Sequence, residues 1–206
     1  MHFDQANPLC DSLDGIIYAK NHGASTVELN SSAGKTKDWD LHWPEGPAAN
    51  HYGFIFVRYT ITGKEKRREM TADEKQRNVM DWDESQIPKW RKTLVKDSRM
   101  ISHQKPATTA RRSYQCRVRG LVPLVEAKSG VYQYPAYATR LVGAMKGVGI
   151  KVPHIQVLAT IPFWREKVVS FHNAGAHVIL LPHGAPRPPD LARYRPYIDT
   201  ISGSWS

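Results

Sequence analysis

The chain has 206 residues, enough for one domain with a sizeable core or for a small α/β barrel. With 41% hydrophobic, 10% aromatic and 23% charged residues, its composition excludes a disordered chain. The net charge of +10 indicates attraction to anions such as nucleic acid, lipid headgroups or phosphate-bearing substrates, although a solvated basic surface explains it more simply. No zinc-finger spacing, RNP-like aromatic motif or helix-turn-helix pattern accompanies the charge, so we expect no nucleic-acid partner.

The cysteines and the apolar runs set the cellular expectations. Cys10 and Cys116 are too few for a disulfide framework, so we expect two free thiols. No apolar run approaches the ~20 residues of a transmembrane helix. The first residues, MHFDQANPLCDS, lack the basic and apolar regions of a signal peptide. We therefore expect a soluble protein that is either cytoplasmic or delivered as part of a larger assembly.

The first half of the chain predicts short elements with an irregular region after them. The run DSLD that begins at Asp11 supplies N-cap side chains for a helix, and Gly23 follows that helix as a C-cap. The run TADE that begins at Thr71 is a capping box and begins a second helix. In chain order, the expected elements are a very short strand at 1–3, the first helix through about 21, strands at 25–29, 37–43 and 52–59, and the second helix through about 80.

Strands and helices alternate in the second half of the chain. After a helix at 108–117, the expected elements are a strand at 121–127, a helix at 135–146, a strand at 152–158, a helix at 163–173, a strand at 177–181, a short helix near 191–194 and a last strand near 197–201. These strands are nearly continuous apolar runs. Such runs between helices are typical of a parallel sheet that helices cover.

Polar side chains close three of the predicted strands. The run LVPLVEAKS ends in Glu126 and Lys128, and residues of these types are rarely buried without partners. The run STVELN ends with Glu28 and Asn30, and DWDLHWP carries His42. This pattern predicts an α/β barrel whose chemistry lies at the carboxyl ends of its strands.

The order of these motifs resembles that of the glycerophosphodiester phosphodiesterase family. That family has a strand ending in His-Arg, a Glu-Asn-Thr helix start, the motif Gly-Ala-x-x-x-Glu-x-Asp, a strand ending in His-Asp, an insertion, and a strand ending in Glu-x-Lys. The counterparts here are His2, the run DSL that begins at Asp11, GASTVELN from Gly23 to Asn30, His42, and EAK from Glu126 to Lys128. The resemblance covers nearly the whole chain. It implies a TIM-type (β/α) barrel of the phosphodiesterase kind, formed by residues 1–206 as one domain with an irregular insertion at about 44–105.

The resemblance also implies metal-dependent hydrolysis of a glycerophosphodiester or a related phosphodiester, which is a small-molecule or lipid-derived substrate. A hard divalent cation, Mg²⁺ or Ca²⁺, neutralises the non-bridging oxygens of such a substrate. Two histidines on either side of the phosphorus move protons on and off the bridging oxygens, and a lysine adds positive charge. The implied roles are Glu28, Asn30 and Glu126 at the metal, His2 and His42 as the acid/base pair, and Lys128 on the phosphate.

The chain departs from the family pattern at three positions. Phe3 replaces the family's Arg and removes a bidentate phosphate donor. Asn30 replaces the second acid of Glu-x-Asp, and Trp43 replaces the Asp of His-Asp. Because only seven of the predicted strands lie outside the insertion at about 44–105, the barrel is compressed in register, open at its last strand, or closed by a partner subunit. These departures leave a second hypothesis, a catalytically degenerate barrel that serves as a structural or binding module of a larger assembly.

Each candidate residue also has a purely structural explanation. Glu126 and Lys128 could form an ion pair at an exposed strand end, and His42 could be a packing histidine. His2 could be disordered beside the initiator methionine. His183 follows an apolar strand and could contact substrate, but histidines are common in loops.

Overall fold

The computed structural model of the chain describes residues 12–33, 42–43, 54–58, 65–77, 81–82, 86, 90–91, 93–94, 97–101, 107–127 and 135–206. The strand expected at 1–3 lies outside these residues.

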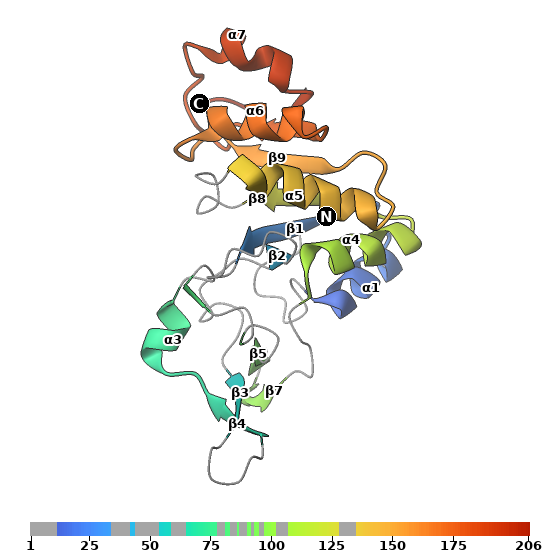
Figure 1. Cartoon of the computed structure of the whole chain (residues 1–206), viewed down its shortest axis with the longest axis vertical. Coiled ribbons are helices and arrows are strands. Elements are labelled where there is room, and N and C mark those ends of the chain that lie inside the picture. Colours follow the sequence, from blue (N-terminus) through green and yellow to red (C-terminus); the bar gives the residue numbers. More distant parts are fainter. Residues whose placement is uncertain are drawn as a thin grey trace.

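A 6-stranded sheet is the centre of the structure (Figure 1). Its strands are β1 (Thr26–Ala33), β2 (His42–Trp43), β8 (Val122–Ala127), β9 (His154–Leu158), β10 (His177–Leu181) and β11 (Thr200–Ile201). They lie in the order β11-β10-β9-β8-β1-β2. Five strands run parallel, namely β1, β8, β9, β10 and β11. The sixth strand, β2, pairs antiparallel with β1. The prediction of an α/β fold with a parallel sheet is therefore confirmed.

Helices from the connections between strands cover one face of this sheet (Figure 1). They are α1 (Leu13–Asn21), α4 (Thr109–Val118), α5 (Pro135–Gly147) and α6 (Trp164–Asn173). The short helices α7 (Leu191–Tyr194) and η4 (Arg195–Tyr197) connect β10 to β11. None of the helices in the described part of the chain is long and apolar enough to cross a membrane.

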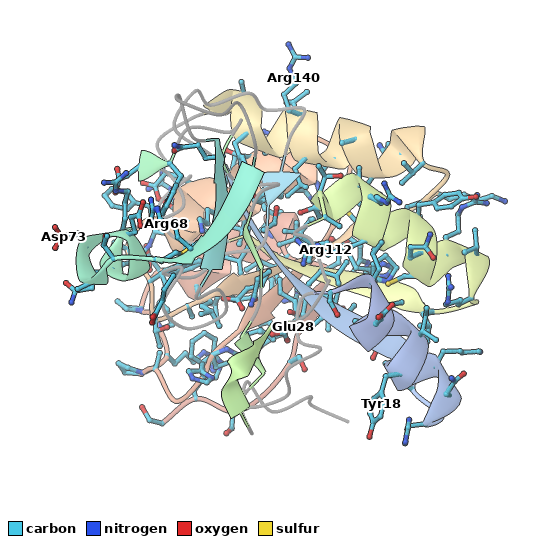
Figure 2. All side chains as sticks on the ribbon, turned by 90° about the horizontal axis from the view of Figure 1, so that it is seen from below. Tyr18, Glu28, Arg68, Asp73, Arg112 and Arg140 are labelled. Atoms are coloured by element: carbon cyan, nitrogen blue, oxygen red, sulfur yellow. The ribbon has the colours of Figure 1, made fainter. Side chains whose placement is uncertain are left out.

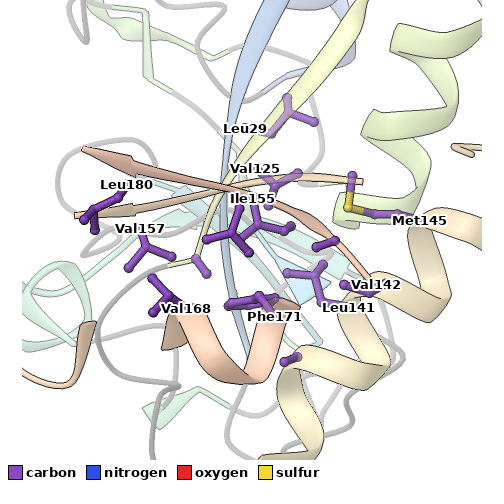
Figure 3. Packing of buried hydrophobic residues seen from close by; sticks show 14 of the residues in the cluster. Leu29, Val125, Leu141, Val142, Met145, Ile155, Val157, Val168, Phe171 and Leu180 are labelled. Atoms are coloured by element: carbon purple, nitrogen blue, oxygen red, sulfur yellow. The ribbon is translucent and has the colours of Figure 1, made fainter. Parts of the chain in front are cut away.

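The core lies between the sheet and these helices. Leu29, Val125 and Ile155 come from three neighbouring strands and lie in one cluster with Leu141 of α5 and Phe171 of α6 (Figure 3). All five side chains are at most 1% exposed. Each fully buried side chain of this size contributes about 1.5–3 kcal/mol, so this cluster fixes which face of the sheet the helices cover.

The strand order distinguishes between two kinds of parallel fold. From β1 through β8, β9 and β10 to β11, neighbours in the sheet follow one another along the chain without a reversal. A doubly wound sheet reverses its strand order and carries helices on both faces, whereas a (β/α) barrel does neither. The order of the five parallel strands is compatible with a barrel, whereas β2, which pairs with β1 on the side away from β8, departs from that pattern. No pairing between β2 and β11 closes the sheet among the described residues, so barrel closure stays a prediction.

The antiparallel strand β2 differs from the expected barrel, in which all neighbouring strands are parallel. Ala33 pairs with His42 and Ser32 pairs with Trp43. The chain therefore turns back beside the carboxyl end of β1. Of the strand expected at 37–43, residues 37–41 lie outside the described residues.

Capping side chains begin the predicted helices. The Ser12 hydroxyl accepts a hydrogen bond from the Gly15 backbone N–H at 3.0 Å at the start of α1. Thr71 and Glu74 form the predicted capping box at the start of α3 (Ala72–Gln76). The expected end of that helix near residue 80 was wrong, because Arg77 is already extended.

Two antiparallel sheets lie between β2 and α4 along the chain. One contains β3 (Phe54–Arg58), β4 (Glu65–Glu69) and β5 (Trp90–Arg91), and the other contains β6 (Thr93–Leu94) and β7 (Asp97–Ile101). The guanidinium of Arg68 in β4 donates to both carboxylate oxygens of Glu74 in α3, each at 2.6 Å. This hydrogen-bonded pair lowers the pKa of Glu74 from 4.5 to about 2. The extent of the insertion at 44–105 stays a prediction.

Candidate functional site

The face of the sheet that the helices leave uncovered carries a row of polar side chains. Asn30 in β1 pairs in register with Glu126 in β8, and Glu126 pairs with Gln156 in β9. Successive side chains of a strand alternate between faces, and Leu29 and Val125 point into the helix-covered core. Asn30, Glu126 and Gln156 therefore lie side by side on the opposite face, on strands about 4.8 Å apart. We call these three residues the polar row.

Two residues of the polar row are buried, and Asn30 is half-buried. Glu126 is 8% exposed and Gln156 is 7% exposed. The side-chain oxygens Asn30 Oδ1 and Gln156 Oε1 are buried, and neither accepts a hydrogen bond within the described part of the chain. A buried carbonyl oxygen without a donor costs about 1–3 kcal/mol, and here two such oxygens flank Glu126, one on each neighbouring strand. These oxygens are available to a ligand.

Glu28 lies on the same face, two residues before Asn30. It pairs in register with Leu124, one step toward the amino end of β8 from Glu126, and its side chain is exposed (Figure 2). The structure therefore brings Asn30 and Glu126 directly together and places Glu28 one step away. The metal-binding roles of the three residues stay predictions.

A buried arginine holds the backbone of β1 at the polar row. Arg112 of α4 is 0% exposed, and its Nη2 donates to the Asn30 carbonyl oxygen at 2.5 Å and to Thr109 Oγ1 at 3.1 Å (Figure 2). A solvated basic surface was the simpler explanation of the net positive charge, but Arg112 is a buried part of that charge. The spacing of Thr109, Arg112, Ser113 and Cys116 marks one buried stripe of a helix and could have identified it.

A hydroxyl cluster adjoins this arginine. The Ser31 Oγ accepts hydrogen bonds from Thr109 Oγ1 and from the Tyr137 hydroxyl, both at 3.0 Å. All three residues are at most 2% exposed. The cluster ties the strand that carries Asn30 to the two helices α4 and α5.

A buried lysine holds the carboxyl end of β8. Lys167 of α6 is 3% exposed, and its Nζ donates to the Ala127 carbonyl oxygen at 2.6 Å. This bond fixes the backbone immediately after Glu126. Lys167 could not be predicted from the sequence, because its position within an amphipathic helix does not indicate that its amine is buried.

The remaining predicted site residues are only partly within the described residues. His2 and Lys128 lie outside them. The backbone of His42 lies beside the carboxyl end of β1 through its pairing with Ala33. His183 follows β10 and is exposed, with a left-handed backbone (φ 49°). Non-glycine residues adopt such a conformation rarely, and they are enriched at functional loops.

Two histidines lie on the same sheet face nearer the amino ends of the strands. His154 and His177 pair in register, and their ring centroids are 4.9 Å apart. Burial lowers the pKa of His154, and the neighbouring charge of His177 lowers it further, while Asp199 opposes this. His177 Nε2 lies 3.0 Å from the Thr200 hydroxyl. His154 lies two residues before Gln156 in β9, and the pair is not part of the polar row.

The chemistry of the polar row fits a hard cation better than a transition metal. The row offers one carboxylate and two amide carbonyl oxygens, and oxygen ligands are those that Ca²⁺ and Mg²⁺ prefer. Within the described residues, no group of three or more His, Cys, Asp or Glu side chains could hold a metal ion. Any cation at this site would therefore depend on amide oxygens as well as on Glu126.

Comparison with known proteins gives a likeness in structure at low sequence identity. No family model matches the chain, and no curated protein matches it. A crystal structure from Silicibacter pomeroyi DSS-3, described as a "putative glycerophosphoryl diester phosphodiesterase", is 12% identical, with a TM-score of 0.48 over 93% of this chain and 83% of that chain. A TM-score below 0.5 at this identity does not establish a shared activity.

Proposed function

We propose that the protein hydrolyses a glycerophosphodiester or a related phosphodiester with the help of a hard divalent cation. The observation that carries the proposal is the register of the sheet, which puts Asn30 beside Glu126. These residues come from GASTVELN and LVPLVEAK, the two most specific motifs of the resemblance. The products would be an alcohol and a phosphomonoester.

Each candidate residue would have its own role in the reaction. Glu126 and Asn30 would hold the cation, with Glu28 as a further carboxylate beside them. When bound, the cation would withdraw charge from the non-bridging phosphoryl oxygens. One of His2 and His42 would take a proton from the attacking water, and the other would give a proton to the departing alkoxide as the P–O bond breaks. Lys128 would place a positive charge near the phosphoryl oxygens.

The second hypothesis, a catalytically degenerate barrel, has its own support. Phe3 and Asn30 each replace a charged residue of the family pattern, and Glu28 is exposed and one register step from the polar row. Fewer anionic ligands weaken binding of a divalent cation. Such a protein would keep the barrel as a structural or binding module.

Hydrolysis of bis(p-nitrophenyl) phosphate separates the two hypotheses. The assay is run with Ca²⁺, with Mg²⁺, and with a chelator in excess. The enzyme hypothesis predicts turnover that the chelator abolishes. Turnover that continues unchanged in the presence of the chelator rules out the role of the metal. The absence of turnover under all three conditions supports the hypothesis of a catalytically degenerate barrel.

Two variants test the roles of the residues, with one matched control. Glu126→Gln should nearly abolish turnover, because it removes the buried carboxylate from a site already short of charge. His42→Ala should lower the rate by ~10²–10⁴-fold, the usual contribution of one acid/base group. Glu166→Gln makes the same chemical change at an exposed position on α6 and should leave the rate unchanged. Equal rates for Glu126→Gln and Glu166→Gln would remove Glu126 from the mechanism.

A further inference from the structure

Gln156 is the member of the polar row that the family pattern does not include. Its register partner is Glu126, its side chain is 7% exposed, and its Oε1 accepts no hydrogen bond from the described residues. The strand around it, HIQVL, is otherwise suited to a buried strand. A glutamine oxygen kept in this position at a cost in stability indicates a ligand for it.

We propose that Gln156 Oε1 is a third oxygen donor to the cation and that the site prefers Ca²⁺ to Mg²⁺. This inference rests on the proposed function for the presence of a cation. It adds a residue from a third strand and chooses between two ions that the sequence left open.

The donor set and the spacing of the strands both favour calcium. Ca²⁺ accepts six to eight oxygens, including amide carbonyls, at about 2.3–2.6 Å with flexible geometry. Mg²⁺ demands nearly octahedral ligands at about 2.0–2.1 Å and keeps most of its waters. Donors on three strands spaced about 4.8 Å apart suit the larger and less demanding ion. With Asn30 in place of an acid, a neutral oxygen from Gln156 would replace part of the lost coordination.

Calorimetric titration with CaCl₂ and MgCl₂ tests this inference. Gln156→Met keeps the size of the side chain and removes the oxygen, so the Ca²⁺ affinity should fall at least ~10-fold. Gln156→Glu should raise the Ca²⁺ affinity, because a charged ligand binds the cation more strongly. Gln115→Met makes the same change on α4, where Gln115 Oε1 accepts from Arg119, and should leave the Ca²⁺ affinity unchanged. Wild type should bind Ca²⁺ more tightly than Mg²⁺.

Thermal unfolding gives a readout that does not depend on activity. Without Ca²⁺, Gln156→Met should melt at the same temperature as wild type or higher, because it removes a buried oxygen that lacks a donor. With Ca²⁺, wild type should gain more in melting temperature than the variant. Equal Ca²⁺ affinity in Gln156→Met and wild type, or a preference for Mg²⁺, would overturn the inference.

The hydrolysis assay and the calcium titration can refute the role of Gln156 and the proposed function independently of each other. Chelator-sensitive hydrolysis with a Ca²⁺ affinity that ignores Gln156 would refute the inference and leave the proposed function standing. Calcium binding that depends on Gln156 without any hydrolysis would refute the proposed function and leave the site standing.

A second surface, at the amino ends of the parallel strands, carries an independent inference. Six of the seven large hydrophobic side chains that are exposed among the described residues belong to α1, α4, the start of β8 and the turn before β9. They are Ile17, Tyr18, Tyr114, Val118, Val122 and Val152. The register that pairs Leu124 with His154 brings the two strand starts together, and Val152 is 52% exposed. We call these six residues the edge patch.

Basic side chains extend across the same edge. A Cβ built on Gly149 would lie 3.1 Å from Arg117 Nε, so this arginine reaches from α4 to the turn before β9. Likewise, a Cβ on Gly175 would lie 2.9 Å from Lys146 Nζ, so this lysine reaches from α5 to the turn before β10. Lys151, in the turn before β9, is exposed. The sequence has no Asp or Glu in α4, in α5 or in 148–153.

We infer that the edge patch binds an anionic lipid surface. Lysines and arginines near such a surface each gain about 1 kcal/mol, and valine and tyrosine side chains enter the headgroup boundary. Nucleic acid would use the cations and the tyrosines but would leave three exposed valines without apolar contact. The mixture of aliphatic and basic side chains therefore favours lipid.

Vesicle sedimentation tests this surface. Vesicles of phosphatidylcholine with phosphatidylserine should sediment the protein, and phosphatidylcholine alone should not. The double variants Val118→Ser with Val152→Ser, and Arg117→Gln with Lys151→Gln, should each lower sedimentation by at least ~5-fold. Arg193→Gln on α7 is the control and should have no effect. Sedimentation that ignores phosphatidylserine, unchanged binding in both double variants, or displacement of the vesicles by a single-stranded oligonucleotide would overturn the inference.

Discussion

Replacing Ser31 with alanine should destabilise the protein by disturbing the two helices that hold the strand of Asn30. The Ser31 Oγ accepts hydrogen bonds from Thr109 of α4 and Tyr137 of α5, and all three side chains are buried. The alanine keeps the backbone and removes the shared acceptor. Ser31→Ala thus tests whether this cluster, rather than apolar packing alone, fixes β1 against the helix layer.

The hydrogen bonds set the expected size of the effect. Leaving a buried O–H group without an acceptor costs about 1–3 kcal/mol. Ser31→Ala does so for the hydroxyls of Thr109 and Tyr137, so the free energy of unfolding should fall by about 2–6 kcal/mol. Tyr137→Phe removes one donor and leaves the bond from Thr109 to Ser31, so it should cost about 0.5–1.5 kcal/mol. The double variant should cost at least ~1 kcal/mol less than the sum, since the phenyl ring no longer needs an acceptor.

Urea unfolding of the four proteins, followed by circular dichroism, gives these free energies. Additive effects, within about 0.5 kcal/mol, would show that Ser31 and Tyr137 are not coupled and would refute the reasoning. A loss below ~1 kcal/mol in Ser31→Ala would do the same, because the cluster would then contribute no more than one exposed hydrogen bond.

Three further predictions concern titrating groups. Burial raises the pKa of Cys116 from 9.0 to about 12, so the free energy of unfolding should decline above pH 9. In a Cys10→Ser variant at about pH 8, the Cys116 thiol should react with a disulfide reagent at least ~100-fold more slowly in the folded protein than in the unfolded protein. Equal reaction rates in the two states would contradict this. The hydrogen bonds from Arg68 lower the pKa of Glu74 to about 2, so the stability they contribute is present above pH 4.5 and is lost toward pH 2, and Glu74→Gln should flatten that part of a stability profile. Burial lowers the pKa of His154, so its contribution is present above pH 6.5 and falls as the pH drops below that value; a profile that His154→Gln does not change would disprove this.

The regular second half of the fold could be predicted because its signals are local. The strand at 177–181 has the predicted bounds, and the helices at 108–117 and 163–173 are correct to within one residue at each end. Nearly continuous apolar runs indicated strands buried in a parallel sheet. The capping box at Thr71 predicted where α3 begins, but its end depends on contacts that the sequence pattern does not carry.

The arrangement around the polar row was only partly visible in the sequence. Glu28 and Asn30 were predicted to end a strand, but β1 continues to Ala33, and the register places both side chains on one face within the strand. Gln156 could not be predicted, because its importance comes from pairing with a strand about 30 residues earlier. The reversal that puts β2 antiparallel beside β1 is likewise a property of tertiary pairing.

A calcium titration of wild type beside Asn30→Asp tests the central claim most directly. The claim is that Asn30 and Glu126 face one cation from neighbouring strands. Restoring the acid of the family pattern should then tighten Ca²⁺ binding several-fold, because hard cations respond to the charge of their ligands. If Asn30→Asp leaves the Ca²⁺ affinity unchanged or weaker, Asn30 does not lie at a cation, and the proposed site on β1 and β8 is wrong.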